Sequence, residues 1–204
     1  MQLTRALPWI VTTAVLGALT GGLTARMLAQ KPIVLRGGTW LPQPRALAPF
    51  QLTDFDGRAY GNAALNGHAS LLFFGYTYCP DICPATLAML RDVQRQAPMA
   101  GLRFLFITVD PERDAPAVLK QYLGTFSSEF TGLSASRGAL RPLMRSLAAD
   151  AERQALPDGN YRLTHSATLY LVDTHGRLAA VYSPPLSAAT LTADLRTLAQ
   201  ASVL

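Results

Sequence analysis

Cysteine and histidine are scarce in this chain of 204 residues, which has two cysteines and three histidines. Two cysteines are too few for the disulfide framework that holds small secreted scaffolds together. The sequence also has no internal repeat and no low-complexity tract, so it gives no sign of a repeat protein or a disordered array. Its length is sufficient for one domain with its own hydrophobic core.

Acidic residues are absent before Asp54, and all 13 of them lie in the rest of the chain with 13 of the 18 basic residues. The net charge of +5 therefore comes from basic residues near the N-terminus: Arg5, Arg26, Lys31, Arg36 and Arg45. A protein that binds nucleic acid would carry its basic excess on the folded domain itself. We therefore expect no nucleic acid among the partners.

Charge is also missing between Arg5 and Arg26, where the residues are mostly apolar. As a helix, this run would span about 30 Å, the thickness of a bilayer's hydrocarbon core. We predict a single transmembrane helix, a membrane anchor within residues 1–30. A cleaved signal peptide is the alternative, but Met27 stands where a cleavage site needs a small residue. The basic residues after the run favour a cytoplasmic C-terminal flank; the chemistry argued below favours the opposite orientation, which we adopt.

Proline and glycine break up residues 31–48, which we predict to be a linker without helix or strand. Residues 49–204 are the predicted domain, in which apolar runs and helical spacing alternate. The expected strands are 50–55, 58–60, 69–74, 102–109, 130–133, 162–172 and 178–182, and the expected helices are 84–96, 114–122, 138–149 and 187–200. Parallel βαβ units followed by a β-hairpin and a final helix predict an α/β, thioredoxin-like fold.

Both cysteines lie in the run Cys79-Pro-Asp-Ile-Cys83, just after a predicted central strand, where open α/β sheets place their sites. A spacing of four puts both sulfurs on one face of a helical turn. Backbone N–H groups at a helix start favour the thiolate form, which both metal binding and disulfide exchange require. A structural disulfide is the alternative, but so small a loop gains little chain entropy from a bridge.

His165 is the candidate third ligand, at the start of a late predicted strand. A lone histidine there is more often a partly buried structural residue, but a thioredoxin-like sheet places this strand beside the cysteine loop. Two thiolates and an imidazole suit Cu(I). Zinc accepts the same atoms, although a structural zinc site usually has four protein ligands. His68 and His175 are predicted to be solvated loop residues.

Three aspartates lie near the predicted site. Asp81, between the cysteines, is interpreted as a helix-end carboxylate rather than part of the site. Asp110 follows the second buried strand, on the same sheet edge as the cysteines, and could shape the site or a partner surface. Asp114 is predicted to be a helix cap.

Three segments together resemble the signatures of the SCO/SenC family: residues 73–84 (Phe-Phe-Gly-Tyr-Thr-Tyr-Cys-Pro-Asp-Ile-Cys-Pro), 108–114 (Thr-Val-Asp-Pro-Glu-Arg-Asp) and 164–173 (Thr-His-Ser-Ala-Thr-Leu-Tyr-Leu-Val-Asp). The resemblance covers roughly residue 49 to the C-terminus. It implies a thioredoxin fold, and one copper ion bound by Cys79, Cys83 and His165. It also implies a role in building the CuA centre of cytochrome c oxidase.

The resulting hypothesis is a copper metallochaperone. Its partners would be a copper donor protein, the oxidase subunit that carries CuA, and the membrane through the N-terminal helix. The domain would lie on the periplasmic side of a bacterial inner membrane; the mitochondrial inner membrane is the second choice.

The main alternative is an enzyme, a thiol–disulfide oxidoreductase that reduces cysteines of an oxidase subunit or another copper protein. Cys79 and Cys83 would then be the redox pair, and His165 a bystander or proton acceptor. A peroxidase is a third option, disfavoured because no distant resolving cysteine is present.

Overall fold

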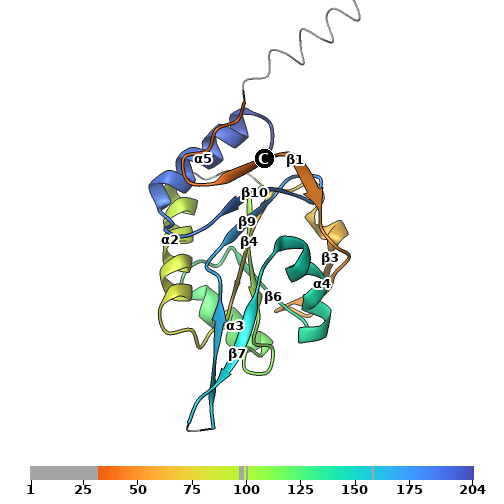
Figure 1. Ribbon diagram of the computed structural model, residues 1–204, viewed down its shortest axis with the longest axis vertical. Helices are drawn as coiled ribbons and strands as arrows, with labels where there is room; N and C mark the ends of the chain where they lie inside the picture. Colours follow the sequence, from red (N-terminus) through yellow and green to blue (C-terminus); the bar gives the residue numbers. More distant parts are fainter. Residues whose placement is uncertain (1–31, 97–98, 100, 158) are drawn as a thin grey trace, which may run out of the picture. The chain divides into compact units, whose positions relative to one another are not determined.

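An eight-stranded sheet forms the centre of the domain (Figure 1), with strand order β1-β10-β9-β4-β5-β6-β2-β3. The structure is a computed structural model that describes residues 32–96, 99, 101–157 and 159–204. The sheet strands are β1 (Thr39–Ala46), β2 (Gln51–Asp54), β3 (Ala59–Gly61), β4 (Ser70–Gly75), β5 (Arg103–Thr108), β6 (Phe130–Ser134), β9 (Leu169–Val172) and β10 (Arg177–Tyr182). The helices are α2 (Ile82–Gln96), α3 (Pro116–Gly124), α4 (Arg137–Leu147), α5 (Ala188–Gln200) and the short 3₁₀ helix η1 (Asn62–Leu65).

Three parallel strands, β4, β5 and β6, make up the middle of the sheet. Every residue of β4 is buried, as expected of an apolar strand covered on both faces. Helices α2 and α3 connect these strands in two βαβ units, because parallel neighbours need a crossover. The predicted α/β architecture is therefore confirmed.

The helices cover the sheet from both sides. Figure 1 shows α2 and α5 on one face and α4 on the other. The buried face of α2 includes Cys83, Leu87, Leu90 and Val93, which recur at helical spacing. Ser187 caps the last helix, since its hydroxyl accepts a hydrogen bond from the N–H of Thr190 at 3.2 Å.

Strand β1 lies inside the stretch expected to have no regular structure, so that expectation is wrong for Thr39–Ala46. β1 pairs antiparallel with β10, with an irregular register between Trp40 and Arg45 that contains both prolines of the strand. It is an edge strand, where a missing N–H is tolerated. Just before it, the backbone N–H groups of Arg36 and Gly37 donate to the buried carboxylate of Asp194 in α5. Residues 33–204 accordingly form one compact unit.

The long strand predicted over 162–172 is two strands. β8 (Tyr161–His165) pairs antiparallel with β7 (Ala151–Ala155), which was not predicted, and the two form a separate ribbon. β9 then joins β4 and β10 in the main sheet. His165 therefore ends a ribbon strand rather than beginning a sheet strand. β7 is polar and mostly exposed, so no hydrophobic alternation marks it in the sequence.

No helix within the described part of the chain combines the length and the apolar character needed to cross a membrane. The predicted membrane anchor lies within residues 1–31, outside the described residues, and it stays a prediction.

Candidate metal centre

Cys79, Cys83 and His165 meet beyond the carboxyl end of β4. Their two sulfurs and an imidazole nitrogen all lie within 4.8 Å of one another. The sulfur of Cys83 is 3.1 Å from Nε2 of His165, although the two residues are 82 positions apart in the chain. Cys79 and Cys83 are both free and form no disulfide. The structure thus brings together the three predicted site residues.

Gly75, the last residue of β4, makes room for the sulfur of Cys83. A Cβ at this position would lie 2.9 Å from that sulfur and 2.7 Å from the ring of Phe106. Only glycine permits so close an approach of a side chain to the backbone. Cys83 can therefore be fully buried in the first turn of α2, while Cys79 lies in the loop before the helix and keeps 8% of its surface exposed.

The ring of His165 is oriented by one hydrogen bond and two aromatic contacts. Its Nδ1 lies 3.1 Å from the carbonyl oxygen of Ser166, which can only accept, so this contact assigns the ring proton to Nδ1. Nε2 faces the cysteines, where it can bind a metal ion. The rings of Phe73 and Tyr76 pack edge-on against the imidazole. A backbone carbonyl on the far nitrogen is the usual support of a metal-binding histidine.

The two thiols have opposite pKa shifts. The hydrogen bond from the Cys83 thiol is the largest cause that lowers the pKa of Cys79 to about 4, with further contributions from His165 and backbone N–H groups against the effect of burial. The backbone N–H of Cys83 also lies 3.4 Å from the Cys79 sulfur. The same interaction with Cys79, followed by burial, raises the pKa of Cys83. Without a metal, Cys79 is the thiolate at neutral pH and Cys83 is the thiol.

This asymmetry predicts how the free protein reacts with iodoacetamide. With a pKa of about 4, Cys79 is fully ionised above pH 6, so its alkylation rate should be nearly constant from pH 6 to 8. Cys83→Ala removes the main hydrogen-bond donor and should raise the pKa of Cys79, so that the rate falls as the pH approaches 6. The rates can be followed by mass spectrometry. A wild-type rate that rises about tenfold per pH unit over this range, like that of an ordinary thiol, would contradict the assignment.

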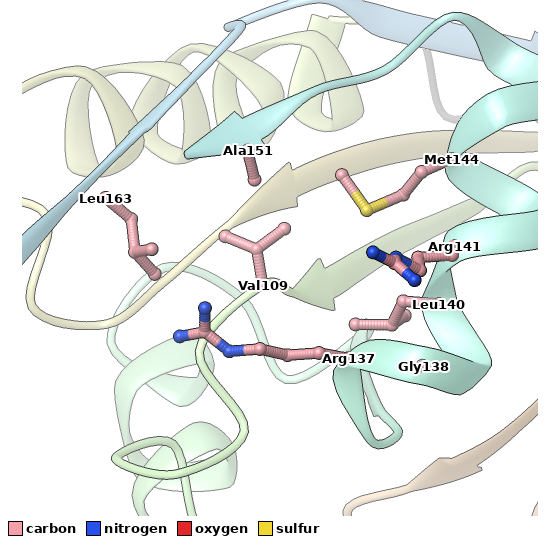
Figure 2. Close-up of a pocket in the computed structure, with 8 residues that line it drawn as sticks. All are labelled: Val109, Arg137, Gly138, Leu140, Arg141, Met144, Ala151 and Leu163. Carbon is pink, nitrogen blue, oxygen red and sulfur yellow. The ribbon is translucent and has the colours of Figure 1, made fainter. Parts of the chain in front are cut away.

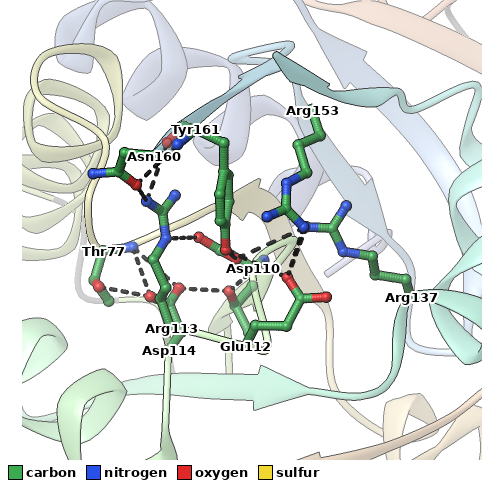
Figure 3. Close-up of polar contacts among 10 residues, drawn as sticks. Thr77, Asp110, Glu112, Arg113, Asp114, Arg137, Arg153, Asn160 and Tyr161 are labelled. Atoms are coloured by element: carbon green, nitrogen blue, oxygen red, sulfur yellow. Dashed lines mark hydrogen bonds and ion pairs between the residues drawn. The ribbon is translucent and has the colours of Figure 1, made fainter. Parts of the chain in front are cut away.

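Asp114 is not the predicted helix cap. The cap position of α3 is Ala115, which makes no side-chain bond, and the fully buried carboxylate of Asp114 turns towards the cysteine loop. It accepts hydrogen bonds from the backbone N–H and hydroxyl of Thr77 (Figure 3). It also accepts one from the hydroxyl of Thr108. Burial raises the pKa of Asp114, partly offset by these bonds. Its role is to fix the loop that carries Cys79.

Asp110 is also fully buried, and it contacts the ribbon that carries His165. The hydroxyl of Tyr161 donates to one of its oxygens at 2.6 Å, and Nε of Arg113 donates to the other (Figure 3). The sequence-based idea that Asp110 shapes the site agrees with this placement. The parts played by Arg113 and Tyr161 were missed, because nothing in the sequence indicates that the ribbon folds onto this turn.

The other candidates lie apart from the thiols and imidazole. Asp81 is exposed at the start of α2, where its carbonyl accepts the N–H of Ala85, in line with its interpretation as a helix-end residue. His175 is exposed in a turn, and His68 is partly buried. Neither histidine belongs to the cluster.

A cavity of about 340 Å³ lies between α4 and the ribbon, and no cysteine lines it (Figure 2). Its lining combines apolar side chains with two arginines: Val109, Arg137, Gly138, Leu140, Arg141, Met144, Ala151 and Leu163. Leu163 and Ala151 belong to the ribbon, so the cavity lies against the underside of the ribbon.

A parallel α/β core with two thiols and an imidazole beyond a central strand defines a thioredoxin-like protein with a donor set suited to a soft metal ion. Comparison with known proteins gives the family. The SCO1/SenC family model matches residues 41–200, and the chain belongs to this family.

Relatives and solved structures agree. A putative copper-binding protein of Stutzerimonas stutzeri is 36% identical over 149 residues, which are 72% of this chain and 73% of that protein. The copper-bound structure of ScoI from Bradyrhizobium japonicum is 38% identical, with a TM-score of 0.67 over 74% of this chain and 98% of the other. Copper-bound yeast Sco1 is 29% identical, with a TM-score of 0.69 over 77% and 90%. The predicted family is confirmed.

Proposed function

We propose that this protein is a copper metallochaperone that delivers copper for assembly of the CuA centre of cytochrome c oxidase. The observation that carries the proposal is the cluster of two sulfurs and one imidazole nitrogen within 4.8 Å of one another. The family membership and the two copper-bound relatives support it.

Copper is the cargo in this proposal, one ion per domain, held by Cys79, Cys83 and His165. Thiolate sulfur and imidazole nitrogen are donors that Cu(I) prefers, whereas a structural zinc site usually has four protein ligands. Within the described residues the cluster supplies three. A three-donor site leaves the ion open to a ligand from a partner, and ligand exchange then passes it on. The partners are a copper donor protein and the oxidase subunit that receives the ion.

The proposal is tested by oxidase assembly in a host that lacks its own copy of the protein. The wild-type chain should restore oxidase containing CuA, and Cys79→Ser should not, because it removes one sulfur donor. His175→Ala is the matched control, since His175 is an exposed histidine outside the cluster. Normal CuA in cells with Cys79→Ser would contradict the proposal.

A thiol–disulfide oxidoreductase is the second candidate, and one observation favours it. The low pKa of Cys79 beside the buried thiol of Cys83 is the asymmetry that disulfide exchange uses: one sulfur attacks and the other resolves the mixed disulfide. Both functions use the cysteines, but only the chaperone needs His165.

We further propose that residues 1–30 anchor the protein in a membrane, with the domain on the periplasmic side of a bacterial inner membrane. The apolar run between Arg5 and Arg26 supports the anchor, and the CuA-assembly role supports the side. A reporter enzyme that works only outside the cytoplasm should be active when fused after Leu204. Activity of only a cytoplasmic reporter would show that the basic residues after the run set the opposite orientation.

A further inference from the structure

His165 is carried by a ribbon that has little support from the main sheet. β7 and β8 pair with each other and with no other strand among the described residues. On the underside of the ribbon, Leu163 is buried in the hydrophobic core, and both Leu163 and Ala151 also border the cavity shown in Figure 2. Leu163 is the one buried residue of β7 and β8. The position of the ribbon therefore depends on polar contacts to a greater degree than that of a fully buried strand such as β4.

Those contacts form a clasp, by which we mean Asp110, Arg113 and Tyr161. The two oxygens of Asp110 are occupied, one by the Tyr161 hydroxyl and one by Nε of Arg113 (Figure 3). The Arg113 guanidinium also lies 3.8 Å from the centre of the Tyr161 ring, and its Nη1 donates to the Tyr161 carbonyl at 3.1 Å. Asp110 is fully buried, so a charged hydrogen-bonded group here has a large influence on the geometry around it.

The clasp also contacts the cysteine half of the site. The Arg113 guanidinium lies 5.0 Å from the ring centre of Tyr78 and 5.8 Å from that of Tyr76, both in the loop before Cys79. The next residue, Asp114, accepts hydrogen bonds from Thr77 in the same loop. The turn at residues 110–114 therefore joins the loop with the two thiols to the ribbon with the imidazole.

We infer that Arg113, acting with Asp110 and Tyr161, is a positioning residue that holds His165 against the two cysteines. It thereby sets whether copper is bound by three donors or by the two sulfurs alone. Tyr161 and His165 are the first and last residues of the short strand β8, so a shift at one end moves the other. Binding groups must be held to within about 0.5 Å. The inference rests on the proposed copper site and adds a residue that does not touch the ion.

The test is a double-mutant cycle on Cu(I) affinity, using the reduced protein and a competing chelator. Arg113→Gln keeps a polar side chain but loses the charge and the fork-shaped donor set. We expect it to weaken copper binding about 10- to 100-fold, the range for groups that orient a metal ligand. In a His165→Ala background the same substitution should have little further effect on Cu(I) affinity, because the imidazole that Arg113 positions is already absent. X-ray absorption should show that copper in Arg113→Gln has lost its nitrogen donor.

Two further variants complete the test. Tyr161→Phe removes only the hydroxyl that bonds Asp110, so it should also weaken Cu(I) binding. It replaces Arg113→Gln in the cycle if Arg113→Gln does not fold. Arg162→Ala is the control, because Arg162 lies on the same ribbon but bonds Gln154 within it. It should bind copper like the wild type.

Two results would overturn the clasp while leaving the copper site intact. One is that Arg113→Gln and Tyr161→Phe both bind Cu(I) with wild-type affinity while His165→Ala binds it more weakly. The other is a loss of equal size with and without His165, which would mean that Arg113 acts on the cysteines or on the fold. A wild-type protein that binds no copper would instead overturn the proposed function, and the clasp inference with it.

Discussion

Oxidation of Cys79 and Cys83 to a disulfide is expected to remove nearly all copper affinity. The bridge consumes two of the three donors, and only the deprotonated thiolate binds the ion. Weakening a group that merely supports a ligand costs about 10- to 100-fold, so losing two donors should cost about a thousandfold or more. The sulfurs are already close and both are free, which makes the oxidised form accessible.

The measurement is copper content and affinity of the same protein in both redox forms. The reduced protein should bind one Cu(I) per chain, and reduction of the oxidised sample should restore that stoichiometry. Reduced Cys79→Ser is a useful comparison, because it lacks one sulfur without forming a bridge. Equal copper content in the two redox forms would rule out a site built from both thiolates.

The variant His165→Ala is expected to separate copper delivery from thiol chemistry. It removes the nitrogen donor, so copper affinity should fall by at least about 10- to 100-fold. Disulfide exchange depends on the thiolate fraction, the leaving sulfur and access, and none of these requires an imidazole. His165 contributes to the low pKa of Cys79 but is not its largest cause, so the thiolate should persist at neutral pH.

Affinity and thiol–disulfide cycling should therefore be measured on the same His165→Ala preparation, with His175→Ala as the control. In cells, His165→Ala should fail to assemble CuA. Normal assembly with His165→Ala, together with failure of Cys79→Ser, would show that the cysteines act as a reductase and that copper delivery through this site is not the function.

The sequence predicts the parts of the fold in which local pattern and tertiary structure agree. The buried strand β4 and the apolar face of α2 are both visible as hydrophobic periodicity, and they fix the place of the two cysteines. The proximity of His165 required the fold as an additional assumption. That assumption correctly placed His165 beside the cysteine loop, although His165 ends β8 instead of beginning a sheet strand.

The parts that the sequence did not predict depend on contacts between distant segments. The two prolines in β1 are breakers by local rules and are tolerated only because the strand lies at a sheet edge. β7 has no apolar pattern, since its main partner is another ribbon strand. Asp114 looks like a cap because it precedes a helix, whereas its true partner Thr77 lies 37 positions earlier.

Because residues 36–46 are attached to the domain, they do not lengthen the linker between the domain and a membrane anchor. If the proposed anchor ends at Arg26, six residues of chain (27–32) separate it from the compact unit, and fully extended they would span about 20 Å. An unstructured linker from residue 27 to residue 49 would instead have spanned about 80 Å when fully extended. A membrane anchor ending there would keep the domain within that distance of the bilayer, and a recipient would have to present its copper site at the same height.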